Sequence, residues 1–295
     1  MTVSLSGPFA LAVCADDFGL SASIDTAIMQ LALAGRVSGI GCMVQGRTWP
    51  DGARQMRRLG LDVDVGLHLN FTEPVDSWGP LYPLHEVLMR SYTGSLDSAA
   101  IRASIELQLD HFESAFGRPP HYIDGHQHVH QLPVIRDALL ASLTRRYRRP
   151  PWVRCTIRRR SASLWRSRDE RKAWVIESLG GRALARAADE AGIARNDCFL
   201  GVYGFADLRP SYAVRMGAWL DAACARDVLV CHPGVAAEPG DAIGPARVAE
   251  FEFLTSDAFA QALADRRIEI RRLPVGGLSI APSHLQPLTP QEDRR

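Results

Sequence analysis

Histidine and aspartate residues recur in this sequence at points where apolar, strand-like runs end. They are Asp16 and Asp17, His68, Asp124, His126, His128 and His130, and His232. Neutral imidazoles and carboxylates are common ligands of catalytic divalent metals, and such sites also need an open position for water and an acid and a base nearby. These residue types therefore predict a metal-dependent hydrolase.

The third group of these residues is spaced two apart along the chain. In an extended chain, alternate residues share a face, so Asp124, His126, His128 and His130 would all point the same way. Imidazoles crowded on one face need a metal or a polar pocket, although a histidine-rich surface turn is the simpler alternative. We expect Asp124 to orient His126 or His68 through a hydrogen bond to the second ring nitrogen. His128 and His130 remain candidates for substrate contacts or for a ligand in place of His126.

The adjacent pair Asp16 and Asp17 also has two interpretations. The stretch Asp-Asp-Phe-Gly is an acceptable turn from a strand to a helix, with an aspartate near the helix start. In a regular strand the two side chains would face opposite sides, so both reach one site only if the strand ends between them. Gly19 permits such a break because glycine tolerates unusual backbone angles. His68 alone would usually be a hydrogen-bonded core residue, but its place after an apolar run favours a role in the site.

Strand-like and helix-like segments alternate along the chain. Predicted strands cover residues 9–15, 37–44, 63–69, 122–126, 152–156, 199–202, 228–231 and 268–273. Predicted helices cover residues 23–34, 49–59, 97–116, 133–145, 211–225 and 256–265. The alternation predicts an α/β fold with a mainly parallel sheet, either a (β/α) barrel or an open doubly wound sheet. Both bind ligands at the carboxyl ends of the strands, so we expect the histidines and aspartates to share that rim.

Composition limits the classes of partner. The formal net charge of +1 gives no overall attraction to nucleic acid or to an anionic membrane. We expect neither a signal peptide nor a membrane span, because no basic stretch precedes a long apolar run. The six cysteines form no CxxC pair and mostly lie in apolar runs, which favours a reducing cytoplasm. One domain over residues 1–280 and a flexible tail over residues 281–295 are expected.

Two segments are candidates for substrate recognition. Trp78, Tyr82 and Tyr92 lie in a glycine- and proline-containing stretch that is long enough to form a wall on which sugar rings stack, and the segment 234–247 is a candidate loop to close over the site.

Residues 145–172 are rich in arginine, with Trp152 and Trp165 interleaved. We expect a charged insertion in contact with solvent. The alternatives are an anchor for an anionic group on a sugar and an RNA-binding patch, although the near-neutral net charge argues against nucleic acid as the main partner.

Four motifs resemble those of the YdjC-like carbohydrate deacetylases, which include chitooligosaccharide deacetylases. They are Ala15-Asp16-Asp17-Phe18-Gly19-Leu20-Ser21, Gly66-Leu67-His68-Leu69-Asn70, Asp124-Gly125-His126-Gln127-His128-Val129-His130 and Cys231-His232-Pro233-Gly234, and they occur in the family's order. The resemblance spans residues 9–273. It implies a variant (β/α) barrel that uses one divalent metal to remove the acetyl group from an N-acetylated sugar, such as a chitooligosaccharide.

The resemblance also implies roles for individual residues. Asp17, His68 and His126 would bind the metal, Asp16 would be the base, and His232 would be the acid. A second set is expected to support these groups or to contact substrate: Asn70, Asp124, His128 and His130. The ligand types suit zinc, manganese, cobalt or iron, whereas the family resemblance implies magnesium, so the metal stays open. A homodimer would be ordinary for a protein of this class.

Two other functions remain open at this point. One is a metal-dependent phosphoesterase, for which a second metal near His128 and His130 would be the mark. The other is a non-catalytic protein that binds sugar or nucleic acid through residues 145–172, with strong dependence on salt.

Overall fold

The computed structural model describes residues 8–75, 79–159, 167–206 and 211–274. Trp78, Trp165 and the predicted tail over residues 281–295 lie outside the described residues.

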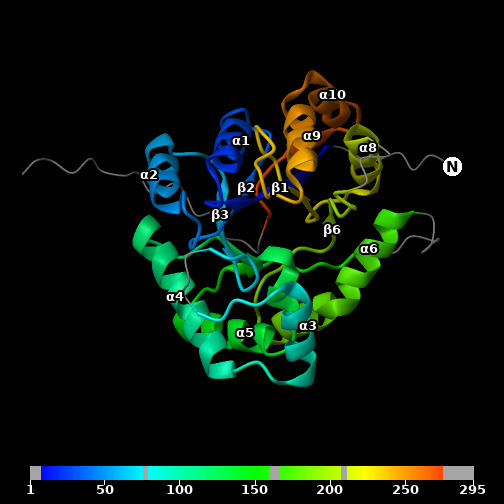
Figure 1. Ribbon diagram of the computed structural model, residues 1–295. Helices are drawn as coiled ribbons and strands as arrows, with labels where there is room; N and C mark the ends of the chain where they lie inside the picture. The colour runs from blue at the N-terminus through cyan, green and yellow to red at the C-terminus, as the bar shows by residue number, and fades with distance from the viewer. Residues whose placement is uncertain (1–7, 76–78, 160–166, 207–210, 275–295) are drawn as a thin grey trace, which may run out of the picture.

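A curved sheet of parallel strands forms the centre of the fold (Figure 1). Its described strands are β1 (Phe9–Phe18), β2 (Gly39–Cys42), β3 (Asp64–Leu69), β4 (Tyr122–Gly125), β5 (Trp152–Val153), β6 (Phe199–Leu200), β7 (Val228–Cys231) and β8 (Ile268–Ile270). The order is β5-β4-β3-β2-β1-β7-β6, with β8 also paired to β1, and each of these pairs is parallel. The predicted α/β fold with a mainly parallel sheet is confirmed.

The two edges of the sheet approach each other through the chain that follows β5. The buried side chain of Asn196 accepts a hydrogen bond from the Cys155 N–H at 2.7 Å and donates one to the Cys155 carbonyl at 2.9 Å. Farther along, the Phe199 N–H donates to the Ile157 carbonyl at 2.7 Å. These contacts join the segment after β5 to the segment that leads into β6. The sheet therefore curls as in a barrel, and the variant (β/α) barrel is the better of the two predicted architectures.

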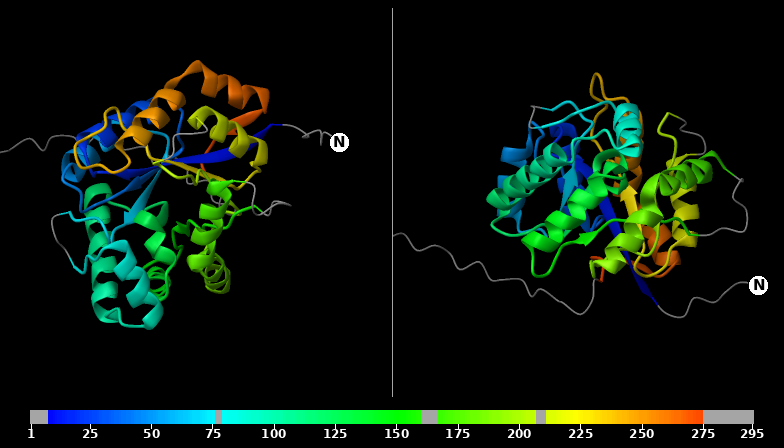
Figure 2. Two further views of the ribbon diagram at one scale, coloured as in Figure 1. Left: turned by 45° about the vertical axis from the view of Figure 1, so that its right-hand side comes forward. Right: turned by 90° about the horizontal axis from the view of Figure 1, so that it is seen from below.

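Helices surround the sheet (Figures 1 and 2). One group, at the top of Figure 1, comprises α1 (Ala22–Leu33), α2 (Trp49–Leu59), α8 (Tyr212–Ala222), α9 (Gly244–Thr255) and α10 (Asp257–Asp265). The other group, lower in that view, comprises α3 (Leu84–Thr93), α4 (Ser98–Phe116), α5 (Ile135–Arg146), α6 (Arg168–Ile176) and α7 (Arg182–Glu190). The sequence analysis did not predict α3, α6, α7 or α9. Among the described residues, no helix has the length and apolar character needed to cross a membrane.

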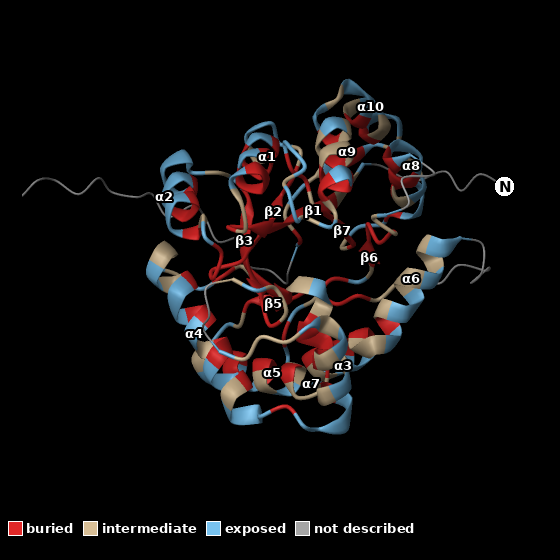
Figure 3. Ribbon diagram, in the orientation of Figure 1, coloured by how far each residue is buried: buried red, intermediate tan, exposed pale blue. Residues whose placement is uncertain are grey.

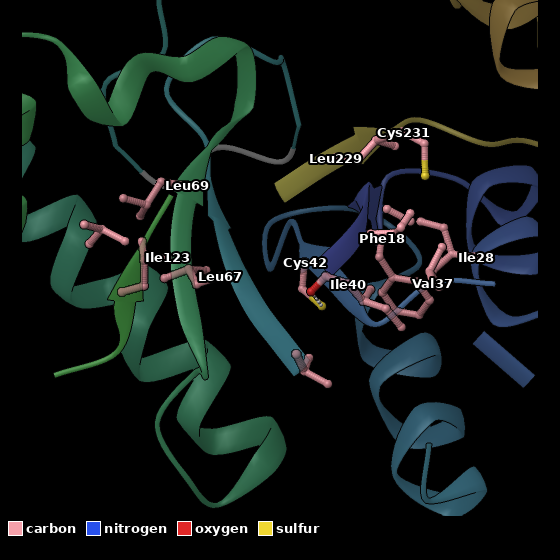
Figure 4. Packing of buried hydrophobic residues seen from close by; sticks show 14 of the residues in the cluster. Phe18, Ile28, Val37, Ile40, Cys42, Leu67, Leu69, Ile123, Leu229 and Cys231 are labelled. Carbon is pink, nitrogen blue, oxygen red and sulfur yellow. Dashed lines mark hydrogen bonds between the residues drawn. The ribbon is translucent and has the colours of Figure 1, made fainter. Parts of the chain in front are cut away.

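The core lies between the sheet and these helices, where Figure 3 shows most of the strand residues as buried. All six residues of β3 are buried, as expected for a parallel strand covered on both faces. In Figure 4, Leu67 and Leu69 of β3 lie beside Ile123 of β4, while Phe18 of β1 lies beside Ile28 of α1. Burial of each such side chain stabilises the fold by about 1.5–3 kcal/mol.

The long helix α4 illustrates how local sequence signals set element boundaries. At its start, the Asp97 side chain accepts hydrogen bonds from the backbone N–H groups of Ala99 and Ala100. At its end, Gly117 has a φ of 66°, a left-handed conformation that suits glycine. Aspartate and glycine are typical residues at the start and end of a helix, so the sequence alone indicated both boundaries. The predicted helix over residues 97–116 matches α4 closely.

Candidate metal centre

In the sequence analysis, both aspartates could reach one site only if the strand ended between Asp16 and Asp17. Strand β1 instead continues to Phe18. Asp17 instead has a φ of 73°, Gly19 follows with a φ of 97°, and the register with β2 shifts between Ala15 and Phe18. A positive φ at a residue other than glycine is uncommon and interrupts the alternation of side chains along the strand. Both carboxylates consequently face one cavity.

The segment from Asp124 to His130 is not extended, so the prediction of one shared face was wrong. Pairing with β3 stops at Gly125, and a 3₁₀ helix, η1 (His126–Gln131), follows. Without a neighbouring strand to hold it extended, the chain turns and sends the side chains in different directions. Asp124 and His130 are fully buried, whereas His126 and His128 line the cavity.

Three potential metal ligands converge where β1, β3 and β4 end. Asp17 Oδ1 lies 3.4 Å from His68 Nε2 and 3.0 Å from His126 Nδ1. The three ligand atoms of this group all lie within 4.8 Å of one another. One carboxylate oxygen and two imidazole nitrogens form a donor set that suits a divalent metal with further positions left for water or substrate. The residues present therefore fit the metal that the sequence predicts.

Neighbouring side chains hold two of these ligands in place. Asp124 Oδ1 lies 2.6 Å from His68 Nδ1, which leaves the other ring nitrogen of His68 facing Asp17. Of the two partners predicted for Asp124, it thus contacts His68. On the other side, Arg247 donates a hydrogen bond of 2.7 Å to Asp17 Oδ2, so Oδ1 is the oxygen turned toward the histidines.

The charges around the ligands shift their pKa values. Burial alone would raise the pKa of Asp17, but Arg247 and His126 outweigh it and hold that pKa well below its usual value. Burial likewise works against a charged His68, yet Asp124 and Asp16 raise its pKa to about 10. The surroundings of His68 therefore favour positive charge on its ring, and a metal bound to His68 would have to displace that proton.

Arg154 is a central residue of the site that the sequence analysis did not single out. Its fully buried guanidinium donates to Asp16 Oδ1 at 2.8 Å and to Asp16 Oδ2 at 2.6 Å, and it also lies 2.6 Å from Asp124 Oδ2. A planar guanidinium suits this two-point contact. The available signal was its place within the apolar strand-like run over residues 152–156, directly after Val153.

Asp16 and Asp124 belong to a second group of potential ligands, with His68. Arg154 already places a positive charge between the two carboxylates, which makes this group less suited to a cation than the first. Burial raises the pKa of Asp16 although Arg154 opposes it, whereas the pKa of Asp124 is lowered because Arg154 and His68 outweigh its burial. Of the two, Asp16 is the better proton acceptor.

His232 faces Asp16 from the end of β7. Its Nε2 lies 3.9 Å from Asp16 Oδ2. Its backbone N–H donates to the buried Glu250 at 2.5 Å, and its ring packs edge-on against Phe205 at 5.1 Å. Burial, together with Arg247, lowers the pKa of His232 to about 3, so its ring is neutral at pH 7.

The remaining predicted residues occupy different places. Asn70 uses its side chain to close a turn after β3, accepting from the N–H groups of Thr72 and Glu73 and donating to the Glu73 carbonyl. His130 is fully buried and donates to the Arg154 carbonyl at 2.7 Å. It therefore contacts the backbone of Arg154 and none of the three potential metal ligands. His128 lines the cavity and packs edge-on against Phe199.

Neither group of potential metal ligands found in the described part of the chain includes His128 or His130. The second metal that would indicate a phosphoesterase thus gains no support from these two histidines.

The proposed ligands, base and acid line one cavity of about 340 Å³. They are Asp16, Asp17, His68, His126 and His232.

The predicted aromatic wall does not form from the tyrosines described. Tyr82 lies under the guanidinium of Arg90, and the Tyr92 residue is 53% exposed. The cavity-facing residues of that stretch are Leu84 and Leu88 instead.

The arginine-rich segment 145–172 is distributed over α5, β5 and the start of α6. Several of its described charges are paired within the chain. Arg146 contacts three acidic residues of α4, Arg158 donates to Glu177 at 3.0 Å, and Arg159 donates to Asp227 at 2.7 Å. These pairs weaken the case for an anionic partner at this segment.

Known proteins resemble this chain in sequence. A family model described as YdjC-like protein matches residues 10–265. The carbohydrate deacetylase of Mus musculus is 34% identical over 149 residues, which are 45% of this chain and 46% of the relative. The chitooligosaccharide deacetylase of Yersinia pestis (strain Pestoides F) is 33% identical over 138 residues, which are 44% of this chain and 54% of the relative. The chain spans about half the length of the curated relatives it matches.

A solved structure from Enterococcus faecalis V583, of a protein named for cellobiose-phosphate cleavage, shares the fold. Its TM-score is 0.64 at 20% identity, with coverage of 90% of this chain and 98% of that one. At this identity the likeness concerns the fold alone.

Proposed function

Because this chain belongs to the YdjC-like protein family, we propose that it is a metal-dependent hydrolase that removes the acetyl group from an N-acetylated sugar. The observation that carries the proposal is the convergence of His68 Nε2 and His126 Nδ1 on Asp17 Oδ1, in a cavity that Asp16 and His232 also line. Two relatives, 34% and 33% identical, carry the names carbohydrate deacetylase and chitooligosaccharide deacetylase, which supports an N-acetylated sugar as substrate.

Asp17, His68 and His126 would hold the metal. A divalent ion bound there would polarise the amide carbonyl and lower the pKa of water in the site. The donor set suits zinc or another transition metal, while the family resemblance implies magnesium. Asp124 and Arg247 each bond one ligand and thereby fix which of its atoms faces the others.

Asp16 would accept the proton of the attacking water. Its two oxygens are fixed by Arg154 at 2.8 and 2.6 Å, and each keeps a further lone pair because a carboxylate oxygen can accept more than one hydrogen bond. Arg154 therefore orients the base without occupying it fully. General-base assistance of this type is typically worth about a hundredfold to ten-thousandfold in rate.

His232 would donate a proton to the leaving nitrogen. Its ring is neutral at pH 7 because burial lowers its pKa to about 3, so it must gain a proton during the reaction before it can act as an acid. Asp16, whose Oδ2 lies 3.9 Å from His232 Nε2, is the nearby group that would pass on the proton taken from water. Amide cleavage needs this protonation because an amide anion is a poor leaving group.

The proposal is tested by release of acetate and free amine from N-acetylglucosamine and its oligomers, with each candidate metal supplied in turn. We expect release by the unaltered protein, a loss of about a hundredfold or more in Asp16→Asn and His232→Ala, and loss of bound metal in His68→Ala. The matched control is His85→Ala, which alters an exposed histidine of α3 outside the cavity lining. Release that persists unchanged in Asp16→Asn with metal bound would contradict the assignment of the base.

A further inference from the structure

Aliphatic side chains form much of the wall of the cavity that holds the ligand group. The residues concerned are Leu84, Leu88, Leu132, Ile176, Leu179 and Ile243. Leu132 is buried, whereas the other five are partly exposed. The surface next to the proposed reaction centre is therefore apolar, although sugar hydroxyl groups need hydrogen-bonding partners.

Two polar residues in the same wall, Gln131 and Lys172, are already bonded to the protein. Gln131 donates to the Ile176 carbonyl at 2.7 Å and accepts from the Thr156 hydroxyl. Lys172 donates to the Tyr203 carbonyl at 2.6 Å. These contacts engage two of the polar side chains in the wall, while Gln127 and His128 line the cavity as well.

Tyr203 and Lys172 present carbon surface in addition. The Tyr203 hydroxyl donates to Glu250 at 2.6 Å, so it is directed into the protein. The Lys172 ammonium lies over the ring of Phe205, 4.6 Å from its centroid. The charge of Lys172 is thus engaged by the carbonyl and the ring together.

Two helices, α3 and α6, supply apolar contacts to this wall from different parts of the chain (Figure 1). Leu84 and Leu88 are four residues apart on α3 and so share one helix face. Ile176 ends α6, and Leu179 follows it. A partly exposed apolar wall that is continuous with a hydrolytic site is a feature of ligand pockets for apolar groups.

We propose that the substrate carries an apolar group of several carbon atoms close to its amide, and that Leu84, Leu88 and Ile176 bind this group. The inference rests on the proposed function and narrows its substrate class. The same chemistry has two sources: an alkyl group linked to the sugar through its glycosidic oxygen, or an N-acyl chain longer than acetyl. In both, hydrolysis adds water across the C–N bond and yields a carboxylate and an amine.

The test compares two substrate series with the metal-loaded protein. In one, the methyl, butyl and octyl glycosides of N-acetylglucosamine differ in the alkyl group. In the other, the methyl glycoside of glucosamine carries an acetyl, butanoyl or octanoyl group on nitrogen. Amine release gives kcat/KM, and calorimetry gives the Kd of each compound independently of turnover. Affinity should rise about fourfold for each methylene that becomes buried.

We expect at least a tenfold gain in both kcat/KM and affinity from the shortest to the longest member of one series, and that series identifies the source of the apolar group. The gain should shrink in Leu88→Gln. It should persist in Met89→Gln, the same change at the adjacent position of α3, where the residue is 60% exposed and absent from the cavity lining.

The two proposals fail in different ways. Acetate release with no chain-length gain in either series would overturn the apolar subsite and leave the deacetylase intact. Tighter binding of the longer compounds without any amine release would support the subsite and overturn the deacetylase. A gain that is equal in Leu88→Gln and in the unaltered protein would overturn the placement of the subsite on α3.

Discussion

Replacing Arg154 by methionine would leave two buried carboxylates without their shared partner. Arg154 is fully buried and contacts both oxygens of Asp16 and one oxygen of Asp124, while these two aspartates are at most 1% exposed. Methionine has a similar length and keeps most of the apolar packing of the arginine stem. The substitution therefore removes mainly charge and hydrogen bonds.

The expected loss of stability is about 3–5 kcal/mol, the usual cost of breaking a buried ion pair by removing one partner. The control is Arg145→Met, which breaks a contact with Glu106 on the surface, where the Arg145 side chain is 56% exposed. An exposed pair is worth about 0–1 kcal/mol. Both substitutions replace arginine by methionine, so they differ chiefly in how deeply the broken ion pair is buried.

The pH dependence gives a second readout with a definite sign. In Arg154→Met, the buried carboxylates lack a positive partner, so the folded-state pKa of Asp16, which is already raised, rises further, and the lowered pKa of Asp124 rises too. An acid whose pKa is raised on folding loses stability as pH increases, because the unfolded chain ionises first. Arg154→Met should therefore lose less stability at pH 5 than at pH 7, and adding Asp16→Asn and Asp124→Asn should recover part of the loss at pH 7.

Urea unfolding followed by circular dichroism at both pH values measures these differences. A loss for Arg154→Met at pH 7 that lies within 1 kcal/mol of the loss for Arg145→Met would refute the reasoning, as would an equal loss at pH 5 and pH 7. Either result would mean that water or a rearranged cation reaches Asp16 and Asp124 when the guanidinium is removed.

Three further predictions concern the ligand group and the opposite end of the sheet. Asp124→Asn should weaken metal binding about tenfold to a hundredfold, because the 2.6 Å contact to His68 would lose its charge; calorimetric titration with the metal measures this, and unchanged affinity would reject the role of Asp124. Gly41→Ala should reduce both metal binding and acetate release, since a Cβ there would lie 3.0 Å from Asp16 Oδ1 and 3.4 Å from His68 Nδ1; equal values for the two proteins would show that the site yields to the methyl group. Burial and Arg118 lower the pKa of His121 to about 3, so the unfolded chain takes up a proton first as pH falls below about 6.5. Between pH 7.5 and pH 5, the unaltered protein should therefore lose about 2 kcal/mol more stability than His121→Asn in urea unfolding. Parallel plots of stability against pH for the two proteins would contradict this.

The position of the candidate site at one rim was predictable because it depends on a repeated local pattern. Asp17, His68, Asp124 and His232 lie at or next to the carboxyl ends of β1, β3, β4 and β7. An apolar run identifies a buried strand, and the polar residues after it identify the end that carries chemistry. Pattern reasoning therefore located the strands and their common rim without knowing how the strands pair.

The conformations inside the site were beyond that reasoning. The φ of 73° at Asp17 accompanies a shift of register against β2, and the 3₁₀ turn from His126 begins where pairing with β3 stops. Both depend on how the strands pair, and no local preference of aspartate or histidine requires them. Arg154 and Arg247 lie 138 and 230 residues from Asp16 and Asp17, respectively, so their pairing arises only in the folded chain. The arginine-rich composition concealed Arg154, because most neighbouring arginines suggested a solvent-exposed segment.

The two arginines also set the charge that the proposed metal would meet. Asp16, Asp17 and Asp124 place three buried carboxylates within a few contacts of one another, and Arg154 and Arg247 supply two positive charges. When His68 and His126 are neutral, as metal ligands must be, one negative charge is unbalanced in a region where an isolated charge is costly. Arg247 contacts Oδ2 of Asp17 and leaves Oδ1 free of that contact. The negative charge at Oδ1 therefore lies next to the two imidazoles. In the proposed function, Arg154 thus fixes both oxygens of Asp16, and Arg247 leaves Oδ1 of Asp17 open toward the two histidines.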